Sequence, residues 1–401
     1  MRLPTLLFLT ALTFFTAPAM AEAATTVVVW HAYRGKERAA LEKVAKAYND
    51  KQSDIAIKLL AIPYDAFADK ITAAVPRGKG PDLFIFAQDR LGDWAASEVI
   101  EPLGFWVDDE MLSSFVEPTL SALEYDDALY GLPVAYKMVA LYYNKKLVKT
   151  PPKTTAELIK MAKAHTNPAK KKFGLVYENA NFYFQGAWMQ GFGGRVFDRR
   201  GRPTLNDTSV LASMKFAQKL AHNEGIMPEE VGSTLVTTLF NKGRAAFVIN
   251  GPWFMGEISD VDFGVATLPM IDEAGGKPAK PFLTSEGLIM SANSKAKKES
   301  FEVMKYLTSV EVGLTLALEG RLPVARKEVY DDPRVAKDPQ LAVFRAQLKN
   351  SVPMPNTPAM RMVWSPATTA MNKIINGKQD AKESMAKAQA EVAKLVKGAR
   401  R

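Results

Sequence analysis

One short segment places three kinds of binding side chain directly after an apolar run. Gly80–Arg90 contains the run Leu83–Phe86, which ends in an aromatic residue, and Asp89 and Arg90 follow. A flat ring suits the apolar C–H face of a pyranose. A carboxylate and a guanidinium suit its hydroxyl groups, which both donate and accept hydrogen bonds. A plainer interpretation, in which Phe86 lies in the core and Asp89–Arg90 caps the next helix, remains equally open at this point.

Further aromatic side chains stand where the chain is expected to turn. Trp253 follows the predicted strand Phe247–Ile249, Tyr183 and Phe184 belong to an aromatic triplet, and Trp364 ends a stretch that begins at Met354-Pro355-Asn356. Each ring taken alone is more often part of the core than of a binding site. Their joint occurrence on loops after strands favours binding.

Alternating strands and helices are expected to position these side chains. Val27–Trp30 predicts a strand, Lys36–Asn49 a helix and Ile55–Leu59 a second strand, and a helical stretch then leads to Leu83–Phe86. This order predicts parallel strands with helices on both faces of the sheet. Ligands of such sheets bind beyond the carboxyl ends of the strands, which is where Asp89 and Arg90 would lie.

A second α/β region is expected after residue 141. Thr154, with Glu157 three residues later, predicts the start of a helix. The other expected elements are strands at 174–177 and 245–249 and helices at 210–220, 297–318 and 380–396. Because no flexible linker separates the two regions, we expect short crossing strands between them, which would act as a hinge.

The length and the first residues predict an exported protein with two domains. Residues 1–21 are typical of a secretory signal peptide, with Arg2, the apolar run Leu6–Phe15 and the small-residue pattern Ala19–Ala21. Cleavage would leave 401 − 21 = 380 residues, more than the roughly 250 to 300 that one core accommodates. The chain has no Cys, so a free periplasmic protein, not a lipoprotein, is expected.

The composition disfavours several functional classes. With three His residues far apart and no Cys, we expect neither a transition-metal site nor a cofactor. The formal net charge is +9, but the basic residues alternate with acidic ones along the expected helices. We therefore expect no nucleic-acid partner.

Several motifs, in this order along nearly the whole chain, resemble the maltose/maltodextrin-binding members of the extracellular solute-binding protein family 1. They are Gly80–Arg90, Tyr143–Lys145 with Pro151–Thr154, Phe240–Gly243, Asn250–Trp253, Lys280–Phe282 and Met354–Pro358. The resemblance implies an α/β, two-lobed periplasmic-binding-protein fold with a mostly parallel sheet in each lobe and a multi-strand hinge. The N-terminal lobe would comprise 24–136 plus 285–336, and the C-terminal lobe 137–284 plus 337–401.

The resemblance also assigns roles to individual residues. Phe86 matches an aromatic contact, and Asp89 and Arg90 match hydroxyl-binding groups. The residues that match sugar-stacking or sugar-bonding rings are Tyr183, Phe184, Trp253 and Trp364.

This chain departs from the family pattern at several binding positions. Lys137 and Asn181 replace two acids, so hydroxyl recognition must differ in detail. Further departures are Phe86 in place of an indole, Ser365 in place of a tyrosine and Thr368 in place of an arginine. In the opening loop, Tyr33 and Arg34 either add ligand contacts or simply lead into the helix, and Lys137 is either a sugar contact or a hinge residue.

Three functions are weighed on these residues. The favoured one is a monomeric receptor that closes on a maltodextrin-type oligosaccharide and delivers it to an inner-membrane ABC permease. In the second, the same fold binds an acidic sugar, because Lys137 and Arg34 could add positive charge to Arg90. The third is a glycoside hydrolase, for which Asp89 lacks a persuasive partner, since Glu178 and Glu286 are expected to be surface or cap residues.

Overall fold

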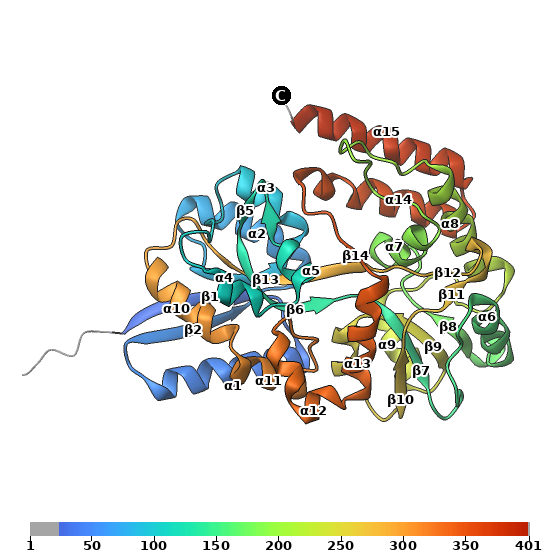
Figure 1. Cartoon of the computed structure of the whole chain (residues 1–401). Helices are drawn as coiled ribbons and strands as arrows, with labels where there is room; N and C mark the ends of the chain where they lie inside the picture. The colour runs from blue at the N-terminus through green and yellow to red at the C-terminus, as the bar shows by residue number, and fades with distance from the viewer. Residues whose placement is uncertain (1–23, 400–401) are drawn as a thin grey trace, which may run out of the picture.

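The computed structural model describes residues 24–399, so the predicted signal peptide lies outside the described residues. The chain forms two lobes side by side, each built around its own sheet (Figure 1). We name the lobes by these sheets, the six-stranded sheet belonging to the N-terminal lobe and the four-stranded sheet to the C-terminal lobe. The lobe ranges given above stay a prediction, and residues 282–284 and 352–353, placed there in the C-terminal lobe, pair within the six-stranded sheet.

The six-stranded sheet has the strand order β14-β13-β3-β1-β2, and β6 also pairs with β13. Its strands are β1 (Thr25–His31), β2 (Ile55–Ala61), β3 (Leu83–Ala87), β6 (Gly131–Lys137), β13 (Phe282–Met290) and β14 (Val352–Pro353). As predicted, β1, β2 and β3 are parallel. β13 runs antiparallel to β3 and β6 because it returns from the other lobe.

The four-stranded sheet has the strand order β10-β7-β9-β8. Its strands are β7 (Ala140–Asn144), β8 (Phe173–Val176), β9 (Ala245–Asn250) and β10 (Phe263–Ala266). Only β8 and β9 are parallel, whereas β7 pairs antiparallel with both β9 and β10. This sheet therefore differs from the mostly parallel sheet that was expected, because β7 enters it from the crossing at residues 138–139.

The helices of the structure include a counterpart of each one expected from the sequence, together with others that were not expected. They are α1 (Gly35–Lys51), α2 (Tyr64–Ala74), α3 (Leu91–Ala96), α4 (Asp109–Ser113), α5 (Glu117–Ser121), α6 (Thr155–Ala164), α7 (Phe182–Gly191), α8 (Thr208–Gln218), α9 (Ser233–Asn241), α10 (Lys297–Leu307), α11 (Val310–Leu318), α12 (Pro333–Ala336), α13 (Pro339–Gln347), α14 (Trp364–Ile375) and α15 (Ala381–Ala399).

Local hydrogen bonds explain where two of these helices begin. The Thr154 hydroxyl accepts from the Glu157 amide at 3.3 Å, and the Glu157 carboxylate accepts from the Lys153 amide at 2.7 Å, so the predicted helix start at α6 is confirmed. The single helix expected over 297–318 is instead two, because Ser309 caps a new helix through the Val312 amide.

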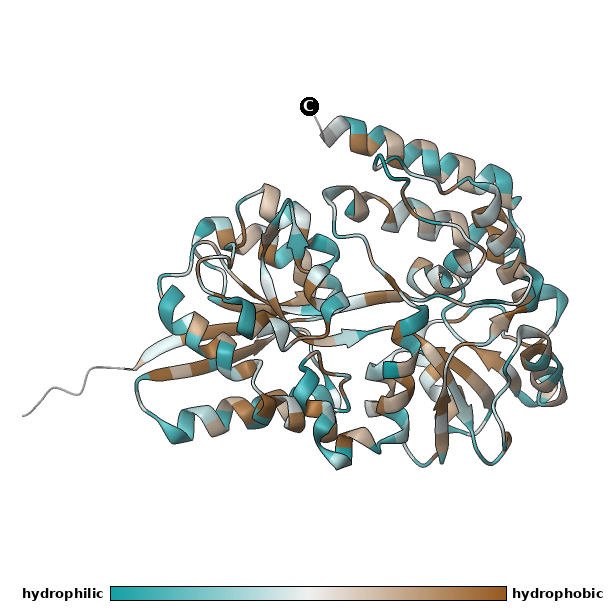
Figure 2. Cartoon of the chain, in the orientation of Figure 1, coloured by the Kyte–Doolittle hydropathy of each residue, from teal (hydrophilic) through white to brown (hydrophobic). Residues whose placement is uncertain are grey.

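Short strands connect the lobes. The chain passes from β6 directly into β7, and β13 begins beside the C-terminal lobe before it enters the middle of the other sheet. β14 adds a third crossing alongside the start of β13. Figure 2 shows hydrophobic residues concentrated on the strands of both lobes and hydrophilic residues on the outer helices.

Candidate functional site between the lobes

The two rings of the C-terminal lobe are held at the ends of its parallel strands. After β8, the Asn181 carboxamide caps α7 by accepting from the Tyr183 amide at 3.0 Å, which fixes Tyr183 in the first turn. After β9, the short 3₁₀ helix Pro252–Gly256 carries Trp253. The two ring centroids are 6.3 Å apart, and both side chains are partly exposed.

Gly251 is required for the position of Trp253. A Cβ atom at residue 251 would lie 2.0 Å from the Trp253 ring, so any other residue would displace the indole. The hydroxyl of Tyr142 also fixes this turn by donating to the Gly251 carbonyl at 2.7 Å. The Asn-Gly-Pro-Trp motif therefore serves to place one ring.

Asp89 and Trp364 meet from different parts of the chain. The indole Nε1 of Trp364 donates to Asp89 Oδ2 at 3.1 Å, and Arg90 Nε lies 3.7 Å from the same oxygen. Asp89 is buried and caps no helix, so the helix-cap interpretation does not hold for this side chain. Burial raises the pKa of Asp89 to about 6, although Arg90 and the Trp364 hydrogen bond oppose this shift.

A chain of contacts joins the predicted rings to Asp89. Tyr183 stacks on Phe282 at 6.1 Å, Phe282 contacts Phe182 at 6.4 Å, and Phe182 meets Trp364 at 6.2 Å. Tyr183 also shares a hydroxyl hydrogen bond of 3.2 Å with Thr284. The structure thus brings Asp89, Arg90, Tyr183, Trp253 and Trp364 into one neighbourhood, which we call the interlobe site.

Phe86 lies behind the ring of Tyr64, which none of the sequence motifs indicates. Phe86 is 4% exposed and is stacked between Phe67, at 4.7 Å, and Tyr64, at 5.0 Å. Tyr64 is 56% exposed, yet surrounding protein raises its pKa, as do the neighbouring Asp89 and Tyr183. Tyr64 therefore covers Phe86 with a largely exposed ring in the N-terminal lobe, near Asp89. The missed signal is an aromatic residue at a helix start just beyond β2.

Phe184 lies in the core of the C-terminal lobe. It is 4% exposed and packs among the buried side chains beneath the four-stranded sheet, edge-on to Tyr183. Helical geometry explains this position, since successive residues of α7 point in different directions. The structure therefore brings only Tyr183 of this pair to the interlobe site.

Lys137 is surrounded by two carboxylates from distant parts of the chain. Its Nζ lies 3.1 Å from Glu37 Oε1 and 3.0 Å from Glu286 Oε1. Glu37 comes from α1 and Glu286 from β13. Glu286 is 7% exposed and lies within a strand, so the expectation of a surface or cap residue is wrong. Two carboxylates from other elements thus lie beside Lys137.

The opening loop connects the two lobes. Arg34 precedes α1 in the N-terminal lobe, and its guanidinium lies 2.7 Å from Glu257 Oε1, which follows Trp253 in the C-terminal lobe. Tyr33 is buried, and its ring lies 5.0 Å from Lys137 Nζ. Arg34 therefore makes an ion pair across the lobes, whereas Tyr33 belongs to the interlobe site.

Several buried polar atoms of this site have no hydrogen-bond partner among residues 24–399. They are Tyr33 Oη, Asp89 Oδ1 and Glu286 Oε2. Buried polar groups normally have partners, because leaving one unsatisfied costs about 1 to 3 kcal/mol. A ligand with hydroxyl groups would supply these partners.

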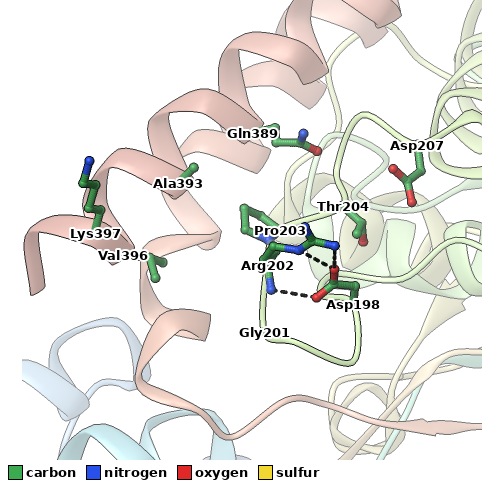
Figure 3. A pocket seen from close by; sticks show the side chains of 10 residues that line it. All are labelled: Asp198, Gly201, Arg202, Pro203, Thr204, Asp207, Gln389, Ala393, Val396 and Lys397. Carbon is green, nitrogen blue, oxygen red and sulfur yellow. Dashed lines mark hydrogen bonds and ion pairs between the residues drawn. The ribbon is translucent and has the colours of Figure 1, made fainter. Parts of the chain in front are cut away.

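A separate hollow of about 520 Å³ lies elsewhere on the C-terminal lobe. It is formed between the loop Asp198–Asp207 and α15, and Arg202 is ion-paired with Asp198 inside it (Figure 3). None of the predicted ligand-binding residues lines this hollow.

Across the described part of the chain, no helix meets the length and apolarity needed to cross a membrane.

Comparison with known proteins identifies the family. Residues 43–343 match the family described as bacterial extracellular solute-binding protein. The chain belongs to this family. Its members are receptors that bind solutes, and the predicted resemblance is confirmed.

Similar solute-binding proteins match almost the entire chain. A maltotriose-binding protein of Pyrococcus abyssi is 32% identical over 93% of this chain and 83% of its own length. A galactooligosaccharide-binding protein of Bacillus subtilis is 28% identical over 92% of this chain and 88% of its own length. A maltooligosaccharide ABC transporter solute-binding lipoprotein of Streptococcus pneumoniae is 28% identical over 85% of this chain and 82% of its own length.

Solved structures of solute-binding proteins share the fold. The maltose/maltodextrin-binding domain of Bdellovibrio bacteriovorus, bound to maltotriose, has a TM-score of 0.86 at 25% identity and covers 93% of this chain and 100% of that one. The Thermus thermophilus maltotriose-binding protein, also bound to maltotriose, has a TM-score of 0.84 at 28% identity. The match covers 92% of this chain and 100% of that one. The prediction of a two-lobed periplasmic-binding-protein fold is confirmed.

Proposed function

We propose that this chain is a receptor for a neutral maltodextrin-type oligosaccharide, which it delivers to an ABC permease of the inner membrane. The observation that carries the proposal is the pairing of partly exposed rings, Tyr183 and Trp253, with the buried carboxylate of Asp89 across the lobe boundary. Aromatic rings pack against the apolar faces of sugars, and charged side chains form strong hydrogen bonds with sugar hydroxyls. The names of the Pyrococcus and Streptococcus relatives support the same ligand class.

The ion pairs of the site favour a neutral ligand over an acidic one. Lys137 is paired with Glu37 and Glu286, Arg34 with Glu257, and Arg90 lies beside Asp89. The positive charges that motivated the acidic-sugar hypothesis are therefore neutralised within the protein. Among residues 24–399, each of the three cations that motivated this hypothesis, Arg34, Arg90 and Lys137, thus has an acidic neighbour.

We further propose that the receptor is not an enzyme and works in the periplasm as an unanchored monomer. Glu37 and Glu286 share one ammonium group, an arrangement suited to fixed hydrogen-bond acceptors rather than to the acid and base of a hydrolase. Incubation with maltooligosaccharides, followed by chromatography, should return every oligosaccharide at its original length. Shortened products would overturn this part of the proposal.

Isothermal titration calorimetry tests the ligand class. Maltotriose should bind the wild type, and Trp253→Ala should weaken binding by about 30-fold, or roughly 2 kcal/mol, because a large ring is lost from the site. Arg202→Ala, which alters the separate hollow of Figure 3, is the matched control and should leave affinity unchanged. A β-1,4-linked galactotriose that binds more tightly than maltotriose would move the assignment to galactooligosaccharides.

A further inference from the structure

The cluster of Glu37, Lys137 and Glu286 joins three elements at the base of the interlobe site. The residues come from α1, β6 and β13, and their side chains are only 8% to 11% exposed. Besides the two close contacts given above, Lys137 Nζ donates to Glu37 Oε2 at 3.3 Å. Two carboxylates thus surround one ammonium, so in its fully ionised form the cluster carries one excess negative charge.

Two polar atoms beside this cluster have unmet hydrogen-bonding capacity. Glu286 Oε2 and Tyr33 Oη are buried, and neither makes a well-formed hydrogen bond within residues 24–399, although the Glu286 carboxylate lies within reach of the Tyr33 hydroxyl. Tyr33 nevertheless lies close enough to Glu286 for the carboxylate to raise its pKa, after burial as the main cause. An acceptor and a hydroxyl donor therefore lie close together, which suits a ligand group that donates to one and accepts from the other.

The cluster faces the rings of the C-terminal lobe. Lys137 Nζ lies 5.9 Å from the centroid of the Trp253 ring. Thr284, two residues before Glu286 on β13, contacts the Tyr183 hydroxyl at 3.2 Å. A sugar ring seated against Trp253 or Tyr183 would therefore bring its hydroxyls to Tyr33 and Glu286.

We propose that Tyr33, Glu37, Lys137 and Glu286 form a hydroxyl-binding subsite in which Glu286 selects uncharged sugars over acidic ones. The proposal rests on the function proposed above and adds the residues that determine specificity. A sugar hydroxyl donates to Glu286 Oε2 and accepts from Tyr33 Oη. A sugar carboxylate cannot donate, and it meets the excess negative charge of the cluster in a buried environment, where repulsion is strong.

A purely structural ion cluster would behave differently. It would hold the hinge strands together, so changing it would alter thermal stability without changing which sugar is preferred. The ratio of two ligand affinities in the same variant separates these possibilities, because a general loss of stability affects both affinities alike.

The experiment measures the affinities of maltotriose and of its C6-oxidised counterpart, a linear triuronate, by calorimetry at pH 7.5. The wild type should bind maltotriose at least about 100-fold more tightly than the triuronate, as expected for an unpaired ligand carboxylate beside a buried negative charge. Glu286→Gln should weaken maltotriose binding by about tenfold and reduce the preference to less than about tenfold. Glu319→Gln, which alters an exposed ion pair with Lys43, is the matched control. It should keep the wild-type affinity for maltotriose and the wild-type preference over the triuronate.

Tyr33→Phe separates the hydrogen bond from the charge. It removes only the hydroxyl, so maltotriose binding should weaken by about tenfold while the preference over the triuronate persists. This variant also keeps the test decisive if Glu286→Gln fails to fold, since maltotriose affinity unchanged in Tyr33→Phe overturns the subsite.

The outcomes distinguish the two proposals. If the wild type binds maltotriose but Glu286→Gln keeps the full preference, the subsite is refuted and the proposed function stands. If the wild type binds neither maltotriose nor another neutral oligosaccharide, the proposed function fails, and the subsite fails with it.

Discussion

The two lobes contribute different chemistry to the same site. The N-terminal lobe supplies mainly charged groups, namely Asp89, Arg90 and the carboxylates around Lys137, whereas the C-terminal lobe supplies the rings of Tyr183 and Trp253. A ligand can shift the balance of open and closed forms only through contacts that differ between them. Because most of the charged groups come from one half and the rings of Tyr183 and Trp253 from the other, a ligand that contacts both sets requires the lobes to be closed.

The largest test of this comparison removes the charge that links the two halves. Asp89→Asn should weaken maltotriose binding by about 100-fold, because the amide loses both a charged acceptor and the strength of the bond from Trp364. Calorimetry measures the effect. Asp82→Asn is the control at the other end of β3: its carboxylate holds Val28 and Ser294, so this change should lower the melting temperature and leave affinity intact. Equal affinities for Asp89→Asn and the wild type would remove Asp89 from the site.

The second test asks whether the N-terminal lobe also contributes a ring. Tyr64→Ala should weaken binding by about tenfold, since Tyr64 covers Phe86 and presents the exposed face of that stack. Phe105→Ala is the control, because Phe105 is 93% exposed and packs on Trp106 beside α10 instead. If the two variants bind equally well, the aromatic contribution belongs to the C-terminal lobe alone.

The third test uses pH. Asp89 is ionised above a pKa of about 6 and protonated below it, so affinity should fall as the pH is lowered through this value. If only the ionised carboxylate of Asp89 accepts hydrogen bonds from the sugar, Kd should rise by about fourfold when the pH is lowered from about 7.5 to about 5.5. The same titration in Asp89→Asn should be flat over this range, and an equally steep response in that variant would assign the titration to another group.

The smallest expected effect concerns the ion pair between the lobes. Arg34→Ala should weaken binding by about twofold at low salt and less at high salt, because Arg34 is 63% exposed and exposed pairs contribute little. Arg38→Ala breaks a comparable pair with Glu42 inside α1 and should not change affinity. A salt dependence that is the same in both variants would show that the pair does not favour the closed form.

Local patterns in the sequence predicted much of the fold. The β1-α1-β2 order follows from the hydrophobic periodicity, and the start of α6 follows from Thr154 and Glu157, because each signal lies within one element. The expected neighbourhood of Asp89, Tyr183 and Trp253 also came from local motifs. Those motifs lie directly after strands, where ligand sites of α/β sheets occur.

Local sequence patterns could not predict the contacts between side chains that are far apart in the sequence. Lys137 meets Glu37 across 100 residues, and Glu286 reaches the same ammonium from a fully buried strand whose apolar neighbours give no sign of an ion pair. Tyr64 resembles an ordinary residue at the start of a helix until β3 brings Phe86 behind it. Such partners depend on sheet order and on the register of β13, which the sequence pattern leaves undetermined.

The position of β13 has a consequence for how the molecule is made. This strand lies between β3 and β6 in the N-terminal lobe, yet it begins only at residue 282. A growing chain that has reached residue 281 therefore has an unpaired edge along β3 and cannot finish the lobe that it started first. The sheet of the N-terminal lobe is therefore complete only when residues 282–290 are in place, so we expect its folding to depend on contacts far apart in sequence.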